Sequence, residues 1–71
     1  MEWLECSEIE VVPGKAGGRP VIKGTRIEPD TILVYEAHGY TPDETRAAYP
    51  TLTVETIRNI RAFAAKHQLV P

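Results

Sequence analysis

Cysteine and histidine are scarce in this sequence: Cys6 is the single cysteine, and His38 and His67 are the two histidines. An internal disulfide is therefore excluded, and neither a Cys-x-x-Cys motif nor a histidine cluster is present to hold a structural metal ion. We accordingly expect no metal and no cofactor. A chain without disulfides suits the reducing cytoplasm, where we expect this protein to reside.

Long apolar runs are also absent. No hydrophobic segment approaches the roughly 20 residues that a membrane-spanning helix requires, and no signal-peptide pattern opens the chain. No nucleophile stands beside a base, and a chain of 71 residues leaves little room to enclose a substrate. We therefore predict neither a membrane protein nor an enzyme.

Positive charge is not in excess either. The net charge is −2, which argues against a surface that binds nucleic acid over its whole extent. Residues 1–40 hold four cationic and seven acidic side chains, whereas residues 41–71 hold four and three. The C-terminal part, which carries the clearest helical patterns, is thus mildly basic.

The length of the chain limits its stability. A domain of 71 residues buries only about 60% of the surface that its unfolded chain exposes, and no disulfide is available to stabilise it. We therefore expect a partner chain, either a second copy or another protein, to contribute to stability.

The most distinctive pattern covers residues 17–27, which hold three of the five glycines and three of the eight cationic side chains. Two alternating pieces, Pro20–Ile22 and Thr25–Ile27, flank a Lys23-Gly24 break, which predicts a short strand, a tight turn or bulge, and a second short strand. The composition of Lys23–Arg26 is compatible with phosphate binding, but the residue order of a P-loop is missing. We therefore interpret the segment as a structural bend.

Two strand-like segments precede this bend, Trp3–Cys6 and Ile9–Val12, because both are rich in β-branched or aromatic residues. The glycine-rich segment Pro13–Gly18 is expected to return the chain so that Val21-Ile22 pairs with Ile9–Val12. A hairpin this small is marginal alone. It should pack on helices or pair its edge with a second molecule.

The first predicted helix begins near Pro29, with Asp30 in its first turn, and ends at Gly39 in the left-handed conformation. Thr41-Pro42-Asp43-Glu44 is a capping box that starts a second, short helix, which must end before Pro50. The residues that these helices are expected to bury are Ile32, Leu33, Tyr35 and Ala37 in the first, and Ala47, Ala48 and Tyr49 in the second.

Thr53 is the expected cap of a third helix that runs from about Val54 to Lys66 or His67. Ile57, Ile60 and Ala64 share one face of it, with Phe63 alongside. The polar residues that point away from this face are Arg58, Arg61 and Lys66, with Asn59 at the edge of the arc.

A short helix joined by a tight turn to a longer basic helix is typical of a helix-turn-helix. In that interpretation Arg58, Asn59, Arg61 and Lys66 are the candidate DNA-binding residues, with arginine suited to guanine or phosphate and asparagine to adenine. The alternative is that they form the solvated face found on any amphipathic helix, since three-helix units serve many functions.

The β region supplies the candidates for a dimer or partner interface, which are Trp3, Ile9, Val11, Arg19, Val21 and Arg26. Trp3 either anchors a dimer or covers the hairpin. The two arginines either lie at an interface, where arginine is enriched, or pair with nearby glutamates.

The block Gly18-Arg19-Pro20-Val21-Ile22-Lys23-Gly24-Thr25-Arg26-Ile27 is followed by His38-Gly39, Thr41-Pro42-Asp43-Glu44, Tyr49-Pro50-Thr51-Leu52-Thr53 and Ile57. From about Pro13 to about Ala65, this pattern resembles the family catalogued as domain of unknown function 433, which is linked to VapB-type antitoxins. The resemblance implies a short β element followed by a homeodomain-like helix-turn-helix.

Three positions depart from the family's usual pattern. Thr45 stands where the second helix commonly has an apolar residue, and Glu36 and Arg61 stand where leucine-like residues are common. A polar Arg61 either widens the basic face or marks a surface that a partner covers. The acidic leader Met1–Val12 has no match to the family's core block.

The sequence therefore predicts a single α+β domain over residues 1–71, with a short N-terminal β-hairpin or strand element (1–28) and a three-helix homeodomain-like helix-turn-helix bundle (29–67). The resemblance implies the antitoxin of a type II toxin-antitoxin pair, a homodimer that binds a PIN-like toxin and represses its own operon by binding operator DNA. The alternative is a protein-interaction or oligomerisation module that does not bind DNA.

Overall fold

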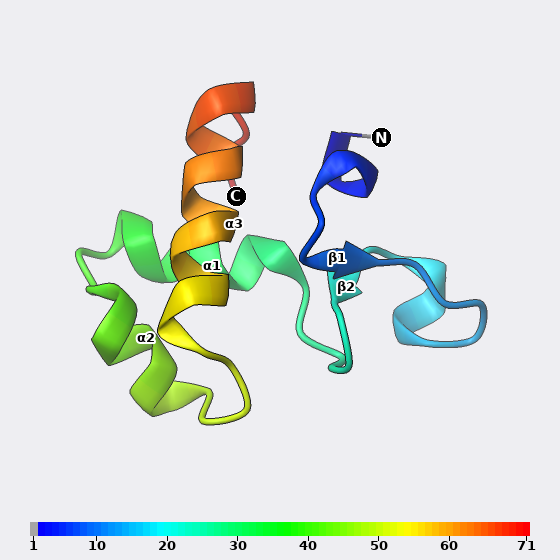
Figure 1. Ribbon diagram of the computed structural model, residues 1–71, viewed down its shortest axis with the longest axis horizontal. Coiled ribbons are helices and arrows are strands. Elements are labelled where there is room, and N and C mark those ends of the chain that lie inside the picture. Colours follow the sequence, from blue (N-terminus) through cyan, green and yellow to red (C-terminus); the bar gives the residue numbers. More distant parts are fainter. Residues whose placement is uncertain (1) are drawn as a thin grey trace.

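The computed structural model describes residues 2–71. A two-stranded antiparallel sheet near the N-terminus is followed by three helices (Figure 1), which confirms the predicted α+β fold. The elements in chain order are the 3₁₀-helix η1 (Glu2–Glu5), β1 (Ile9–Glu10), the 3₁₀-helix η2 (Ala16–Gly18), β2 (Val21–Ile22), α1 (Pro29–Ala37), α2 (Pro42–Ala48) and α3 (Val54–His67). None of the helices in residues 2–71 has the length and apolar character needed to cross a membrane.

The predicted pairing between the two strands is confirmed, with Ile9 opposite Ile22 and Glu10 opposite Val21. The strands are shorter than expected, because the segment that follows Glu10 leaves the sheet and the amide of Lys15 closes a turn by donating to the Val12 carbonyl.

The expected strand over Trp3–Cys6 is wrong, because residues 2–5 form η1. The amide of Cys6 donates to the Trp3 carbonyl, and this curled backbone places the Trp3 ring on Phe63 of α3, with ring centroids 5.5 Å apart. Cys6 is buried. Packing against α3 thus outweighs the β propensity of this segment.

The expected strand over Thr25–Ile27 is also wrong, whereas the predicted bend is confirmed. Gly24 has φ +76°, a conformation that glycine adopts without strain. The amide of Ile22 donates to the Ile27 carbonyl at 2.8 Å, and the amide of Thr25 donates to the Ile22 carbonyl at 2.9 Å. The segment is therefore a tight turn closed at both ends.

The helix boundaries follow the predicted signals. The Thr41 hydroxyl accepts from the Glu44 amide at 3.1 Å while the Glu44 carboxylate accepts from the Thr41 amide at 2.8 Å, which completes the capping box. The Thr53 hydroxyl accepts from the Thr56 amide at 3.0 Å at the start of α3. Gly39 ends the α1 segment with φ +85°.

A single core joins the β element to the helices. Its fully buried cluster contains Cys6, Ile9, Ile22, Ile32, Leu52, Ile57 and Ile60. The predicted burial of Ile57, Ile60 and Ala64 on one face of α3 is confirmed. Because Ile9 and Ile22 belong to the same core cluster as Ile57 and Ile60, the sheet is held against α3.

Three predicted core residues, Ala37, Ala47 and Ala48, are instead exposed. In α2 the buried residue is Thr45, which is 1% exposed. Its hydroxyl donates to the Thr41 carbonyl at 3.1 Å, so the buried oxygen is paired within its own helix. Position 45 is therefore a core position although its residue is polar.

Candidate nucleic-acid interface

The connection from α2 to α3 holds the two helices in a fixed relation. The amide of Leu52 donates to the Tyr49 carbonyl at 2.9 Å, and the Leu52 side chain is 3% exposed. With Thr53 capping α3 one residue later, the turn is closed by backbone bonds and anchored in the core. A closed, anchored connection between two successive helices is one feature of a helix-turn-helix.

Among the four candidate DNA-binding residues, Arg58 and Lys66 are exposed on α3, and neither forms an ion pair within residues 2–71. They lie eight positions apart, which corresponds to about 12 Å along a helix axis. Both side chains are therefore available to an external anion.

Asn59, by contrast, is bound to Glu8 of the acidic leader. Its Nδ2 donates to Glu8 Oε2 at 2.9 Å, and the hydroxyl of Thr56 donates to Glu8 Oε1 at 3.2 Å. One carboxylate thus spans two residues on successive turns of α3. Asn59 can bind a base only after this contact opens.

Arg61 is bound to α1. Its Nε lies 3.1 Å from Glu36 Oε2, and its Nη1 donates to the Tyr40 carbonyl at 3.3 Å. The side chain is 24% exposed. It therefore links α3 to α1 and does not extend the free basic surface.

The candidate interface residues also separate into two groups. Ile9 and Val21 are 5% and 0% exposed in the core of this chain, and Trp3 stacks on Phe63. The group that reaches the surface consists of Val11, Arg19 and Arg26. A partner that contacts Ile9 or Val21 directly would have to open the core.

Arg19 Nε lies 3.2 Å from Glu28 Oε1, and the Arg19 side chain is 61% exposed. This pair borders an open cavity of about 260 Å³ lined by Trp3, Arg19, Pro20, Glu28, Pro29 and Asp30. Arg19 therefore pairs with a nearby glutamate, as one of the two alternatives predicted from sequence.

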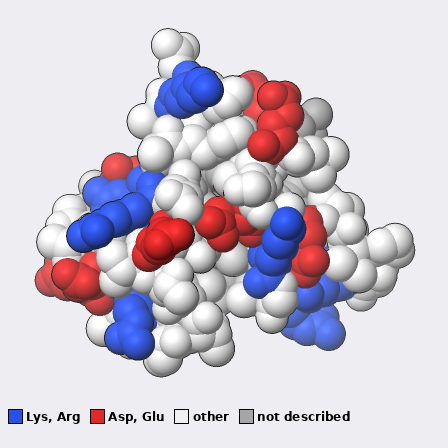
Figure 2. Space-filling model, viewed as in Figure 1, with Lys and Arg blue, Asp and Glu red and all other residues white. Residues whose placement is uncertain are grey.

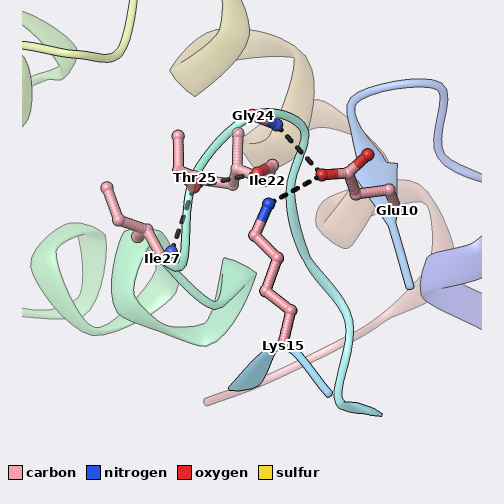
Figure 3. A network of polar contacts seen from close by, with 6 residues as sticks. All are labelled: Glu10, Lys15, Ile22, Gly24, Thr25 and Ile27. Carbon is pink, nitrogen blue, oxygen red and sulfur yellow. Dashed lines mark hydrogen bonds and ion pairs between the residues drawn. The ribbon is translucent and has the colours of Figure 1, made fainter. Parts of the chain in front are cut away.

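A polar network fixes the turn at Gly24 (Figure 3). Glu10 Oε2 accepts from the Gly24 amide at 3.0 Å and from Lys15 Nζ at 3.1 Å. The hydrogen bond from the Gly24 amide is the largest cause that lowers the pKa of the Glu10 carboxyl below its usual value, and the bond from Lys15 is the second largest. Sequence reasoning missed this network because Glu10 and Gly24 meet only through the strand pairing.

The charges do not form one continuous basic surface. On the face that Figure 2 shows, cationic and acidic side chains are interspersed. Within residues 2–71 there is no group of three histidine, cysteine or acidic side chains with the geometry to hold a metal ion. The site is therefore a set of separate cations on and beside α3.

Comparisons with known proteins agree on one family. The family model described as protein of unknown function (DUF433) matches residues 9–64. The crystal structure of a DUF433 member protein from Anabaena variabilis ATCC 29413, at 2.00 Å resolution, is similar to this chain with a TM-score of 0.70 and 29% sequence identity. The match covers 93% of this chain and 67% of that chain. No curated protein matches the sequence.

Proposed function

Since this chain belongs to the DUF433 family, whose function is unknown, we propose from its own geometry that it binds DNA with α3 as the recognition helix. The observation that carries the proposal is the exposure of Arg58 and Lys66 on a helix whose opposite face is locked into the core. A rigid helix with cations on its outer face is the element that enters a major groove.

The proposal extends to an antitoxin that represses its own operon. This part is supported by the resemblance to VapB-type antitoxins, which also supplies the partner, a PIN-like toxin. Apolar surface left uncovered on the single chain, at Leu4, Val11, Val12, Val34 and Tyr40, is compatible with a protein partner.

The proposal includes a homodimer through the β region. The two-stranded sheet has open edges that a second copy can extend. Two copies of α3 double a weak basic surface, and they set the operator half-sites about one helical turn apart.

A second candidate function is a protein-interaction module that does not bind DNA. Two of the four candidate DNA-binding residues favour it, because Asn59 is bound to Glu8 and Arg61 to Glu36. In this case the mildly basic outer face of α3 is exposed to solvent and does not bind nucleic acid.

The two functions differ in their response to salt. The experiment is a fluorescence-anisotropy titration of the protein against duplex DNA from upstream of its own gene and against a scrambled duplex, at low and near-physiological salt. A DNA-binding repressor prefers the native duplex and loses affinity steeply as salt rises, because bound phosphates release counterions. Equal or absent binding to both duplexes would favour the interaction module.

A further inference from the structure

Two cations stand on the tight turn at Gly24 without an ion-pair partner. Lys23 and Arg26 are both exposed, and neither is part of a salt bridge in the described chain, residues 2–71. The neighbouring Lys15 is different, because its ammonium is bound to Glu10. The turn therefore carries two positive charges that nothing within residues 2–71 neutralises by direct contact.

An open groove of about 510 Å³ lies beside this turn. Its lining consists of Lys15, Gly24, Thr25, Arg26, Ile27 and Thr51. Thr51 belongs to the connection between α2 and α3, two residues before the cap of α3. The groove thus lies between the Gly24 turn and the connection that leads into the N-terminus of α3, the proposed recognition helix. The Gly24 turn and this connection both lie in the lower part of the view in Figure 1.

The turn is rigid before any ligand arrives. Glu10 holds the Gly24 amide, while the Thr25 hydroxyl donates to the Ile22 carbonyl at 2.8 Å and accepts from the Ile27 amide at 3.0 Å (Figure 3). Because the backbone is already ordered, binding an anion immobilises only the side chains that contact it.

We propose that this groove binds the phosphate backbone of DNA, with Arg26 from its lining and Lys23 from the adjoining turn contacting phosphates beside the bases that α3 meets. The inference rests on the proposed function, and it adds a second contact surface to it. Arginine suits a phosphate because its planar guanidinium donates two parallel hydrogen bonds. The structural bend predicted from sequence is then the scaffold that presents these two side chains.

Phosphate contacts have a recognisable signature. They are independent of base sequence, so their loss weakens binding to any duplex by the same factor. Each phosphate that is no longer neutralised also makes the plot of log affinity against log salt less steep, by about 0.9. Base contacts from α3 behave differently, because their loss weakens the native duplex more than the scrambled one.

The test compares Lys23→Gln, Arg26→Gln and their double variant with the wild type. Anisotropy titrations use the native and scrambled duplexes over a series of salt concentrations. The matched control is Arg19→Gln, which removes one positive charge beside a different cavity. Both Lys23 and Arg26 are exposed, so all variants should fold, which circular dichroism and thermal unfolding verify.

We expect the double variant to lose about tenfold or more in affinity for both duplexes, because two exposed cations no longer neutralise phosphates. The salt dependence should become less steep by about 2, while Arg19→Gln keeps the wild-type values.

Unchanged affinity and salt slope in the double variant, with the wild type still binding DNA, would overturn the groove inference and leave the proposed function standing. A loss confined to the native duplex would also overturn the inference, because the groove would then recognise bases. If the wild type binds neither duplex at low salt, the proposed function fails first and the groove inference fails with it.

Discussion

Arg61 Nε and Glu36 Oε2 lie 3.1 Å apart and join α3 to α1. These are two of the positions at which the chain departs from the family pattern, where leucine-like residues are common. The structure shows that these two polar residues meet in an ion pair between the helices. From sequence alone they are two unrelated polar residues, and Arg61 is assigned to the DNA surface.

The first prediction concerns this pair. Glu36→Leu and Arg61→Leu should each lower the thermal stability, while the double variant should recover the loss, because two leucines can pack where the ion pair stood. Both side chains are partly exposed, at 43% and 24%, so the coupling energy should be no more than about 1 kcal/mol. Urea unfolding of the four proteins gives the sum of this coupling and of the contact between the two leucines in the double variant. Additive effects would show that the side chains do not act as a pair.

The second prediction separates two arginines of α3. Arg58→Gln should weaken binding to the native duplex by about 1–3 kcal/mol if Arg58 contacts guanine, whereas Arg61→Gln should change it little, because Arg61 is bound to Glu36 and Tyr40. Each variant removes one positive charge from the same helix, so each controls for the other. Equal losses of DNA affinity in the two variants would show that Arg61 also contributes to DNA binding.

The third prediction concerns acid sensitivity. The hydrogen bonds from Gly24 and Lys15 lower the pKa of Glu10 in the folded protein below the ordinary value of 4.5. The stability that this carboxylate contributes is therefore fully present above pH 4.5 and is lost as the pH falls through the folded pKa. Glu10→Gln should be less stable than the wild type near neutral pH, and the difference should shrink in acid. Thermal unfolding from pH 7 to pH 3 measures it, and a constant difference would contradict the prediction.

The sequence predicted the features that depend on close neighbours along the chain. The capping box joins Thr41 to Glu44, and the Thr53 hydroxyl caps α3 by accepting from the Thr56 amide, three positions later. Gly39 adopts the expected left-handed conformation. The pairing of Val21-Ile22 with the segment Ile9–Val12 was also predicted, because a glycine-rich loop separates two apolar segments, whereas the register that places Ile9 opposite Ile22 was not.

The errors and omissions arise from contacts between distant residues. Trp3 lies in a 3₁₀-helix and not in the predicted strand, because its ring stacks on Phe63 of α3. Glu8 and Asn59 are separated by 51 positions in the sequence, and no local sequence pattern predicts their contact. These two contacts become visible only when the positions of the helices are known. Thr45 is an exception with a local cause, since a β-branched polar residue can be buried once its hydroxyl bonds to its own helix.

The fourth prediction follows from this burial. Thr45→Val keeps the side-chain volume and removes a hydroxyl whose acceptor, the Thr41 carbonyl, still receives the Thr45 amide. The stability should therefore change by less than about 1 kcal/mol. Ile60→Ala, at another core position with 0% exposure, should cost about 2–5 kcal/mol. Urea unfolding of both variants compares them, and a large loss in Thr45→Val would show that the hydroxyl bond is essential.

The last prediction concerns Glu8, whose carboxylate binds Thr56 and Asn59 on α3. Its negative charge lies beside the surface that is proposed to approach phosphates, and it occupies the amide of Asn59. Glu8→Gln should therefore bind the native duplex several-fold more tightly at low salt, since a like charge is removed. It should also be less stable by about 1 kcal/mol, because charged hydrogen bonds to α3 are weakened.

The control for this variant is Glu5→Gln, because Glu5 is exposed and forms no ion pair within the described chain. It removes the same charge from the same leader without touching α3. If the gain in affinity is equal in both variants, net charge alone accounts for it. A gain confined to Glu8→Gln, together with its loss of stability, would mean that one acidic side chain ties the leader to α3 and weakens the binding of DNA there. The opposite signs of the two effects make this interpretation testable with one set of proteins, since a purely structural role for Glu8 lowers stability and leaves DNA affinity unchanged.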